Sequence, residues 1–102
     1  MTSYELTVEA EQDIRELVQY TFQKWGSSQV NNYTSYLEAT FEKIGKGNVI
    51  AKKFSDILPE VLVTKSKYHF VFFVSPKNKK PVIIAIIHEK RNILKLLINR
   101  LT

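Results

Sequence analysis

Cysteine is absent from this chain of 102 residues. The protein therefore has no disulfide framework, no thiolate metal site and no thiol nucleophile. Its longest apolar runs, Phe70–Val74 and Val82–Ile87, are far shorter than the roughly 20 residues that a membrane-spanning helix needs. The first residues show neither the basic region nor the apolar run of a signal peptide. We therefore expect a soluble, cytoplasmic protein with no membrane partner.

Glycine and histidine are also scarce. The three glycines, at positions 26, 45 and 47, lack the spacing of a phosphate-binding or dinucleotide-binding loop. His69 and His88 are the two histidines, and Glu89 follows the second. A metal site on two histidines in neighbouring strands is one interpretation, but the sequence favours ordinary strand residues, each with one ring nitrogen satisfied locally. We expect no cofactor and no bound metal.

Charge of opposite sign gathers in the two parts of the chain. Residues 1–44 carry seven acids and three bases, a net charge of −4, whereas residues 45–102 carry twelve bases and three acids, a net charge of +9. Such asymmetry favours an acidic peptide, a nucleic acid or an acidic protein surface as the partner. Lysines that keep a sheet edge soluble are the alternative, and they account for the turn Ser75–Pro81 better than for the bases that flank the strands. Those flanking bases are Lys65, Lys67, Lys90 and Arg91.

Two segments, 67–74 and 82–91, are rich in β-branched and aromatic residues and enclose a polar turn, which predicts a β-hairpin. Neither segment alternates apolar with polar residues, so both faces of these strands need cover. Because an antiparallel sheet commonly leaves one face in water, the second face requires either the chain's own last helix or another molecule.

Apolar residues at helical spacing predict two helices, from about Glu9 to Trp25 and from the serines after Gly26 to Gly45. We expect Ser27 or Ser28 to cap the second helix and a connection of about three residues to make an antiparallel helical hairpin. Aromatic side chains on these helices are interpreted as packing residues. They are Trp25, Tyr33 and Tyr36.

The remaining segments complete the predicted order β-α-α-β-β-β-α. Tyr4–Val8 and Val61–Lys65 are expected to be strands, and Lys46–Pro59 a loop with a short helical turn around Phe54–Leu58. Asn92–Leu101 is helix-prone, with an apolar stripe wide enough to fold back on the sheet or to dock a partner. The sequence thus predicts a single α+β domain over residues 1–102, with an N-terminal helical hairpin packed on a small antiparallel sheet and a short C-terminal helix.

One set of residues has the right types for general acid–base cleavage of RNA, which needs a base for the 2′-hydroxyl, cations for the transition state and an acid for the leaving oxygen. The set is His69, His88, Glu89, Lys65, Lys67, Tyr68, Lys90 and Arg91. Against this chemistry, lysine offers a phosphate only a point charge, and the one arginine lies beyond the strand end.

Several short motifs, in this order and spacing, resemble the ParE branch of the RelE/ParE toxin superfamily over nearly the whole chain. They are the opening Tyr4–Ile14, the corner Lys24-Trp25-Gly26, the strand Tyr68–Phe73, and Ile86-Ile87-His88 followed by Arg91-Asn92. The resemblance implies a toxin of a type II toxin–antitoxin module, a system associated with plasmid stabilisation, held inactive by a small antitoxin whose flexible C-terminal part wraps around it.

ParE-like members inhibit DNA gyrase and stall replication, whereas RelE-like members cut mRNA on the ribosome. RNA-cutting relatives usually carry arginine where this chain has His69, and many carry tyrosine where it has Glu89. These differences favour gyrase inhibition without catalysis and leave a ribosome-dependent mRNA endonuclease as the alternative. The chain also departs from the ParE pattern, with lysine in place of the frequent arginine at positions 65 and 67, and without the usual Asn-Pro…Gly passage before Pro59. A third possibility is a non-toxic nucleic-acid-binding domain, whose affinity would fall steeply with salt.

The resemblance and the charge pattern together give the expected site residues. The expected target contacts are Lys65, Lys67, Lys90, Arg91 and Arg100. The expected antitoxin contacts are Phe73, Ile83, Ile87, Ile93, Leu94 and Leu97. Under the nuclease alternative, which alone predicts direct nucleic-acid binding, the catalytic set is His69, His88, Lys65, Lys67 and Arg91.

Overall fold

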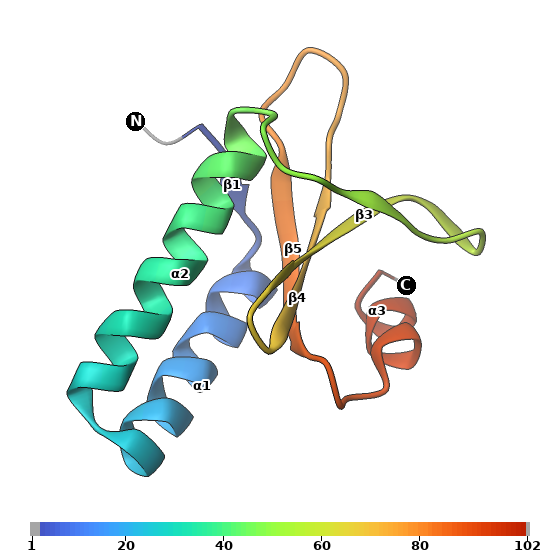
Figure 1. Ribbon diagram of the computed structural model, residues 1–102. Coiled ribbons are helices and arrows are strands. Elements are labelled where there is room, and N and C mark those ends of the chain that lie inside the picture. The colour runs from blue at the N-terminus through green and yellow to red at the C-terminus, as the bar shows by residue number, and fades with distance from the viewer. Residues whose placement is uncertain (1–2, 102) are drawn as a thin grey trace.

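Helices α1 (Val8–Trp25) and α2 (Ser27–Gly45) lie antiparallel on one face of a five-stranded sheet, and helix α3 (Ile93–Leu101) lies on the opposite face (Figure 1). This computed structural model describes residues 3–101. The strands are β1 (Glu5–Leu6), β2 (Lys52–Ser55), β3 (Leu58–Ser66), β4 (His69–Val74) and β5 (Val82–His88). The α+β class predicted from the sequence is confirmed.

The sheet has the order β1-β5-β4-β3-β2, in which β1 runs parallel to β5 and all other neighbours are antiparallel. In the central pair Phe72 lies opposite Ala85 but Phe73 lies opposite Ile83, so that Ile84 is an extra residue on β5. A bulge of this kind changes which face the following side chains take. The two arms do not alternate apolar with polar residues because both faces of β4 and β5 lie in apolar cores.

Local chemistry fixes the ends of the first helix. The Thr7 side chain accepts a hydrogen bond from the backbone N–H of Ala10 at 3.1 Å, and it caps α1 as threonine commonly does. Gly26 alone joins α1 to α2, with φ at 87°, a conformation that glycine adopts without steric cost. The expected three-residue connection is therefore wrong, because one residue with positive φ suffices to reverse the chain. The expected serine cap is also wrong, since α2 has no side-chain cap and Ser27 is already helical.

The segment expected to be a loop contains strand β2, and the helical turn predicted around Phe54–Leu58 is wrong. Lys52 pairs with Val63 and Ser55 with Leu58, with an irregular register between these pairs. Pro59, which was expected to end a helix, lies in β3 near this irregularity, where a missing N–H is tolerated. The hairpin of β2 and β3 therefore adds one strand to the order predicted from sequence.

Each face of the sheet has its own apolar core. The core between the helical hairpin and the sheet contains ten buried residues: Ala10, Leu17, Tyr33, Leu37, Phe41, Ile44, Val71, Phe73, Ile83 and Ile86. Toward α3 lie seven: Val61, Val63, Phe72, Ile84, Ala85, Ile87 and Leu97. The chain's own last helix thus packs on the second face. Within residues 3–101, no helix combines the length and hydropathy that a bilayer span requires.

The three aromatic residues expected to pack on the helices differ in their exposure. Tyr33 is buried, as predicted. Trp25 is 67% exposed at the tip of the helical hairpin, so its interpretation as a packing residue is wrong. Tyr36 is 52% exposed and contacts a lysine, described below. Helical spacing gives the direction of a side chain but not whether a neighbouring element covers it.

Candidate functional site

The central strands end together at one end of the sheet. Ser66 pairs with His69 across the β3–β4 turn, and His69 pairs with His88 at the end of β5. This register gathers the residues that the sequence singled out into one surface, which we call the basic rim. The rim comprises Lys65, Lys67, Tyr68, His69, His88, Glu89, Lys90 and Arg91.

Tyr33 of α2 forms hydrogen bonds with the β3–β4 turn of the rim. Its hydroxyl donates to the Ser66 carbonyl at 2.9 Å and lies 2.5 Å from His69 Nδ1. Burial raises the pKa of Tyr33 to about 12, so the hydroxyl keeps its proton at neutral pH. The hydroxyl has one proton for two partners, so the direction of its hydrogen bond with His69 depends on the tautomer of the imidazole. Tyr33 and the tautomer of His69 are therefore coupled.

His69 and His88 face each other edge to face, with ring centroids 5.0 Å apart. Burial, and to a smaller extent the neighbouring His88, lower the pKa of His69 to about 4. His88 Nδ1 accepts a hydrogen bond from the Lys90 backbone N–H at 3.2 Å. Since a general acid or base works best with a pKa near the operating pH, His69 is poorly suited to proton transfer at neutral pH.

Two of the rim's cations are already engaged. Lys65 forms an ion pair with Glu89 at 2.7 Å, and this hydrogen bond lowers the pKa of the Glu89 carboxyl. The Lys67 ammonium lies 4.2 Å from the centre of the Tyr36 ring, in a cation–π contact. Lys90 and Arg91 are exposed at the end of β5. The rim is thus a positively charged surface around one carboxylate.

Arg100, a residue expected to contact the target, does not belong to the rim. Its guanidinium binds both carboxylate oxygens of Asp13 on α1, at 2.7 Å and 3.1 Å, and also donates to the Ile84 carbonyl at 3.2 Å. Asp13 and neighbouring acids raise the pKa of Arg100 further. These contacts tie α3 to α1 and β5.

The six residues expected to contact an antitoxin fall into two groups. Phe73 and Ile83 are 4% and 0% exposed beneath α1 and α2, and Ile87 and Leu97 are buried between the sheet and α3. Ile93 and Leu94 remain partly exposed on α3. A partner on the intact fold can therefore reach Ile93 and Leu94 but not the other four residues.

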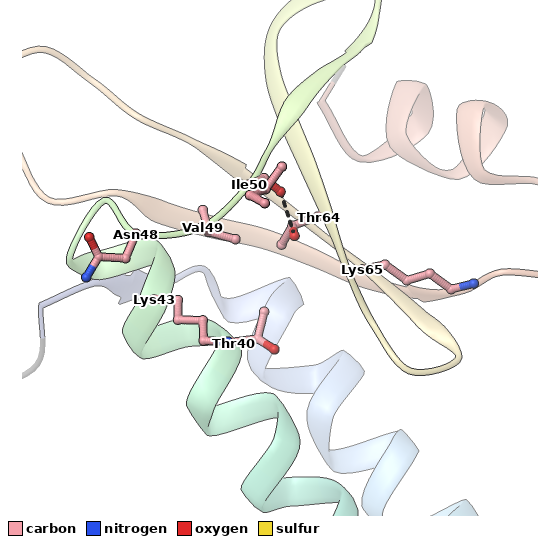
Figure 2. A pocket seen from close by; sticks show the side chains of 7 residues that line it. All are labelled: Thr40, Lys43, Asn48, Val49, Ile50, Thr64 and Lys65. Carbon is pink, nitrogen blue, oxygen red and sulfur yellow. Dashed lines mark hydrogen bonds between the residues drawn. The ribbon is translucent and has the colours of Figure 1, made fainter.

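A cavity of about 250 Å³ lies between α2 and β3 beside the rim (Figure 2). Its lining consists of Thr40, Lys43, Asn48, Val49, Ile50, Thr64 and Lys65. The Thr64 hydroxyl donates a hydrogen bond to the Ile50 carbonyl at 3.1 Å, and the Lys65 side chain points away from the cavity. No titratable pair converges there. Over the described residues 3–101, no group of three or more potential ligands could hold a metal ion.

Sequence reasoning missed three residues that build the site: Tyr33 and Tyr36, which support the rim from α2, and Asp13, which fixes Arg100. Tyr33 and Tyr36 follow each other at i, i+3 on one helix face, a signal that places them together. Nothing in the sequence indicated that the β3–β4 turn would lie against them. Nothing in the sequence distinguished Asp13 from the other acids of residues 1–44.

The fold of this chain, with its helical hairpin, five-stranded sheet and C-terminal helix, is similar to that of a solved structure. That structure, described as the chromosomal ParDE TA system from P. aeruginosa, superposes with a TM-score of 0.71 and 18% identity, covering 86% of this chain and 96% of that one. At this identity the match shows the fold.

The sequence comparisons are more specific. The family described as "ParE toxin of type II toxin-antitoxin system, parDE" matches residues 4–93. A relative named Toxin ParE, from Escherichia coli, is 33% identical over 101 residues, which are 99% of this chain and 98% of the relative. The chain therefore belongs to the ParE toxin family. The resemblance inferred from the sequence is confirmed.

Proposed function

We propose that this protein is the toxin of a type II toxin–antitoxin module, that a cognate antitoxin neutralises it, and that it stops growth by binding and inhibiting DNA gyrase in the cytoplasm. The observation that carries the proposal is the family match over residues 4–93, which spans the helical hairpin, the whole sheet and the rim. Binding rather than catalysis is the finer part of the proposal.

The chemistry of the rim supports binding. A nuclease needs a titratable base and a cluster of available cations at the cleaved phosphate. Here the pKa of His69 is about 4, and Lys65 is paired with Glu89. We assign Lys65, Lys67, Lys90 and Arg91 to contact with the target. Arg100, which is bound to Asp13, acts on the target only indirectly, through the position of α3.

Antitoxin binding is proposed for the outer side of α3 and the positive part of the molecule. An antitoxin segment that is disordered when free can fold onto an apolar stripe, and its acids meet residues 45–102, which carry a net charge of +9. Ile93 and Leu94 are accessible for this contact. Contact with Ile87 and Leu97 requires α3 to leave the sheet, because both residues are buried beneath it.

Replacing both histidines by alanine separates the proposal from the nuclease alternative. A gyrase binder keeps most of its toxicity when His69 and His88 are removed, provided that the protein stays folded. An endonuclease that uses these histidines loses most of its toxicity. Growth arrest after induction in cells without antitoxin is the readout, and antitoxin binding by the double variant shows that it has folded. Loss of toxicity in a folded variant, accompanied by transcript cleavage by the parent protein, would contradict the proposal.

A further inference from the structure

The turn between β3 and β4 has an unusual backbone. Lys67 has φ at 56°, and among residues 3–101 the other non-glycine residue with positive φ is Asn78. Asparagine tolerates this conformation because its short side chain bonds locally, whereas an ordinary side chain pays about 1–2 kcal/mol for it. Two-residue hairpin loops with such a backbone normally carry glycine or asparagine. A lysine at this place is therefore strained, and strain of this kind gathers at functional sites.

Four contacts hold the strained turn in place. The Tyr33 hydroxyl binds both flanking residues, through the Ser66 carbonyl and His69 Nδ1. The Lys67 ammonium rests on the Tyr36 ring at 4.2 Å, and the Glu89 backbone N–H donates to the Tyr68 carbonyl at 3.0 Å. Helix α2 and the end of β5 thus fix the turn from two sides.

The side chain presented by this turn is Tyr68, which is 59% exposed. The backbone bond from Glu89 to Tyr68 places the turn next to the segment that carries the exposed bases Lys90 and Arg91. Tyrosine and arginine are the residue types over-represented among the few contacts that dominate protein interfaces. A tyrosine held on a fixed turn also loses little conformational freedom on binding.

We propose that the β3–β4 turn is a preformed recognition loop, in which Tyr68 is the contact residue and Tyr33 the positioning residue, for a protein partner whose surface offers carboxylates beside a recess for the phenol ring. A protein fits better than a nucleic acid because two of the rim's four bases are already engaged, Lys65 by Glu89 and Lys67 by the Tyr36 ring. The two remaining bases can pair with a few carboxylates but do not form the row of cations that tracks a phosphate backbone. This inference rests on the proposed function, since the partner is the target of the toxin.

Replacing Tyr68 by alanine tests the contact, and the chain offers a matched control. Tyr20 on α1 is also a tyrosine with 59% exposure, away from the turn. Tyr68→Ala should weaken inhibition of gyrase supercoiling by at least about tenfold, as for a residue that dominates an interface. Tyr20→Ala should stay within about twofold of the parent, and both variants should keep the melting temperature because neither ring is buried. Equal inhibition by both variants would overturn the contact role of Tyr68.

A double-mutant cycle tests the positioning role of Tyr33. Tyr33→Phe removes the hydroxyl that holds the turn and should weaken inhibition. Glycine adopts positive φ unaided, so adding Lys67→Gly should shrink the effect of Tyr33→Phe on inhibition. A purely structural role of the hydroxyl predicts the same loss with lysine or glycine at position 67, and that result would overturn the positioning role. Circular dichroism at the assay temperature confirms that each variant is folded.

Failure of this inference and failure of the proposed function are distinguishable. If the parent inhibits gyrase and Tyr68→Ala inhibits it equally, the proposed function stands and the inference falls. If the parent arrests growth without inhibiting gyrase, the proposed target is wrong, and growth arrest by the same variants then decides the inference. Loss of arrest in Tyr68→Ala alone would support it, and equal arrest by both variants would overturn it. Tight binding of the parent to duplex DNA that Tyr68→Ala abolishes would also overturn the choice of a protein partner.

Discussion

Arg100 and Asp13 form a two-pronged ion pair that joins the last helix to the first, with distances of 2.7 Å and 3.1 Å. The pair also forms hydrogen bonds with backbone groups on the edge of β5, beyond the point where the short strand β1 ends. Asp13 Oδ2 accepts the Ile86 backbone N–H at 2.9 Å, and Arg100 donates to the Ile84 carbonyl at 3.2 Å. Two side chains thus substitute for a neighbouring strand, and unpaired edges of this kind otherwise attract other chains.

Removing one member of this pair should destabilise the protein. In Asp13→Asn the Arg100 guanidinium stays partly buried without its counter-charge, which we expect to cost about 2 kcal/mol. For a domain of this size that corresponds to a fall of roughly 10 °C in melting temperature. The matched control is Asp56→Asn, because the Lys53–Asp56 pair at 2.9 Å is largely exposed and should contribute less than about 0.5 kcal/mol. Equal melting temperatures for the two variants would contradict the structural role of the Arg100–Asp13 pair.

Stability should fall as the pH is lowered from about 6.5 to about 4. Burial and the adjacent His88 lower the pKa of His69 to about 4, while Glu89 and Asp13 act in the opposite sense. Between these pH values the unfolded chain binds a proton that the folded chain excludes. The contribution is therefore fully present above pH 6.5, and it declines by at most about 1.4 kcal/mol for each pH unit through this window.

Urea denaturation at a series of pH values measures this effect. His69→Gln keeps a polar side chain without a titrating group, so its free energy of unfolding should depend less on pH between 4 and 6.5 than that of the parent. Identical pH profiles for the two proteins would show that His69 is not held neutral by the fold. The comparison subtracts the other groups that titrate in the same range.

Leu97 should be the main anchor of α3 on the sheet. It is 0% exposed in the second core, so Leu97→Ala should cost about 3 kcal/mol through lost contacts and a residual cavity. Leu101 on the same helix is 44% exposed, and Leu101→Ala should cost less than about 1 kcal/mol. Both variants shorten a leucine of α3 to alanine, and only in Leu97→Ala is the shortened side chain buried.

Hydrogen exchange gives the second readout for these variants. The amides of α3 should lose protection more than those of α1 in Leu97→Ala, because the helix has lost its attachment to the sheet. Uniform loss of protection, or equal stability of Leu97→Ala and Leu101→Ala, would contradict the role of α3 as a docked cover.

Much of this fold follows from sequence because local and long-range signals agree. Helical spacing and Gly26 place the two helices, and the two β-rich arms place β4 and β5. β2 was missed because Lys52-Lys53-Phe54-Ser55 lacks a strand pattern of its own and forms by pairing with β3. The strand predicted at Val61–Lys65 is shorter than β3, because a proline at position 59 is typical of a strand boundary.

The sequence predicted which residues form the rim but not how the other expected site residues are arranged. Register between neighbouring strands brings His69 beside His88 and the flanking bases into one rim, as the hairpin implied. The sequence could not show that Arg100 would turn toward Asp13, since 87 positions separate them. Nor could it show that Phe73 and Ile83 lie under the helical hairpin, because an apolar strand residue reads the same whether its cover is intramolecular or foreign. Burial of these two residues depends on tertiary packing alone.

The most direct test is a supercoiling assay with purified DNA gyrase, relaxed plasmid and this protein, with and without its antitoxin. A translation reaction monitored for transcript cleavage runs beside it. We predict that the protein inhibits supercoiling in a dose-dependent manner, that a stoichiometric amount of antitoxin restores it, and that transcripts stay intact. Full supercoiling at concentrations of the protein that cleave mRNA on the ribosome would contradict the central claim.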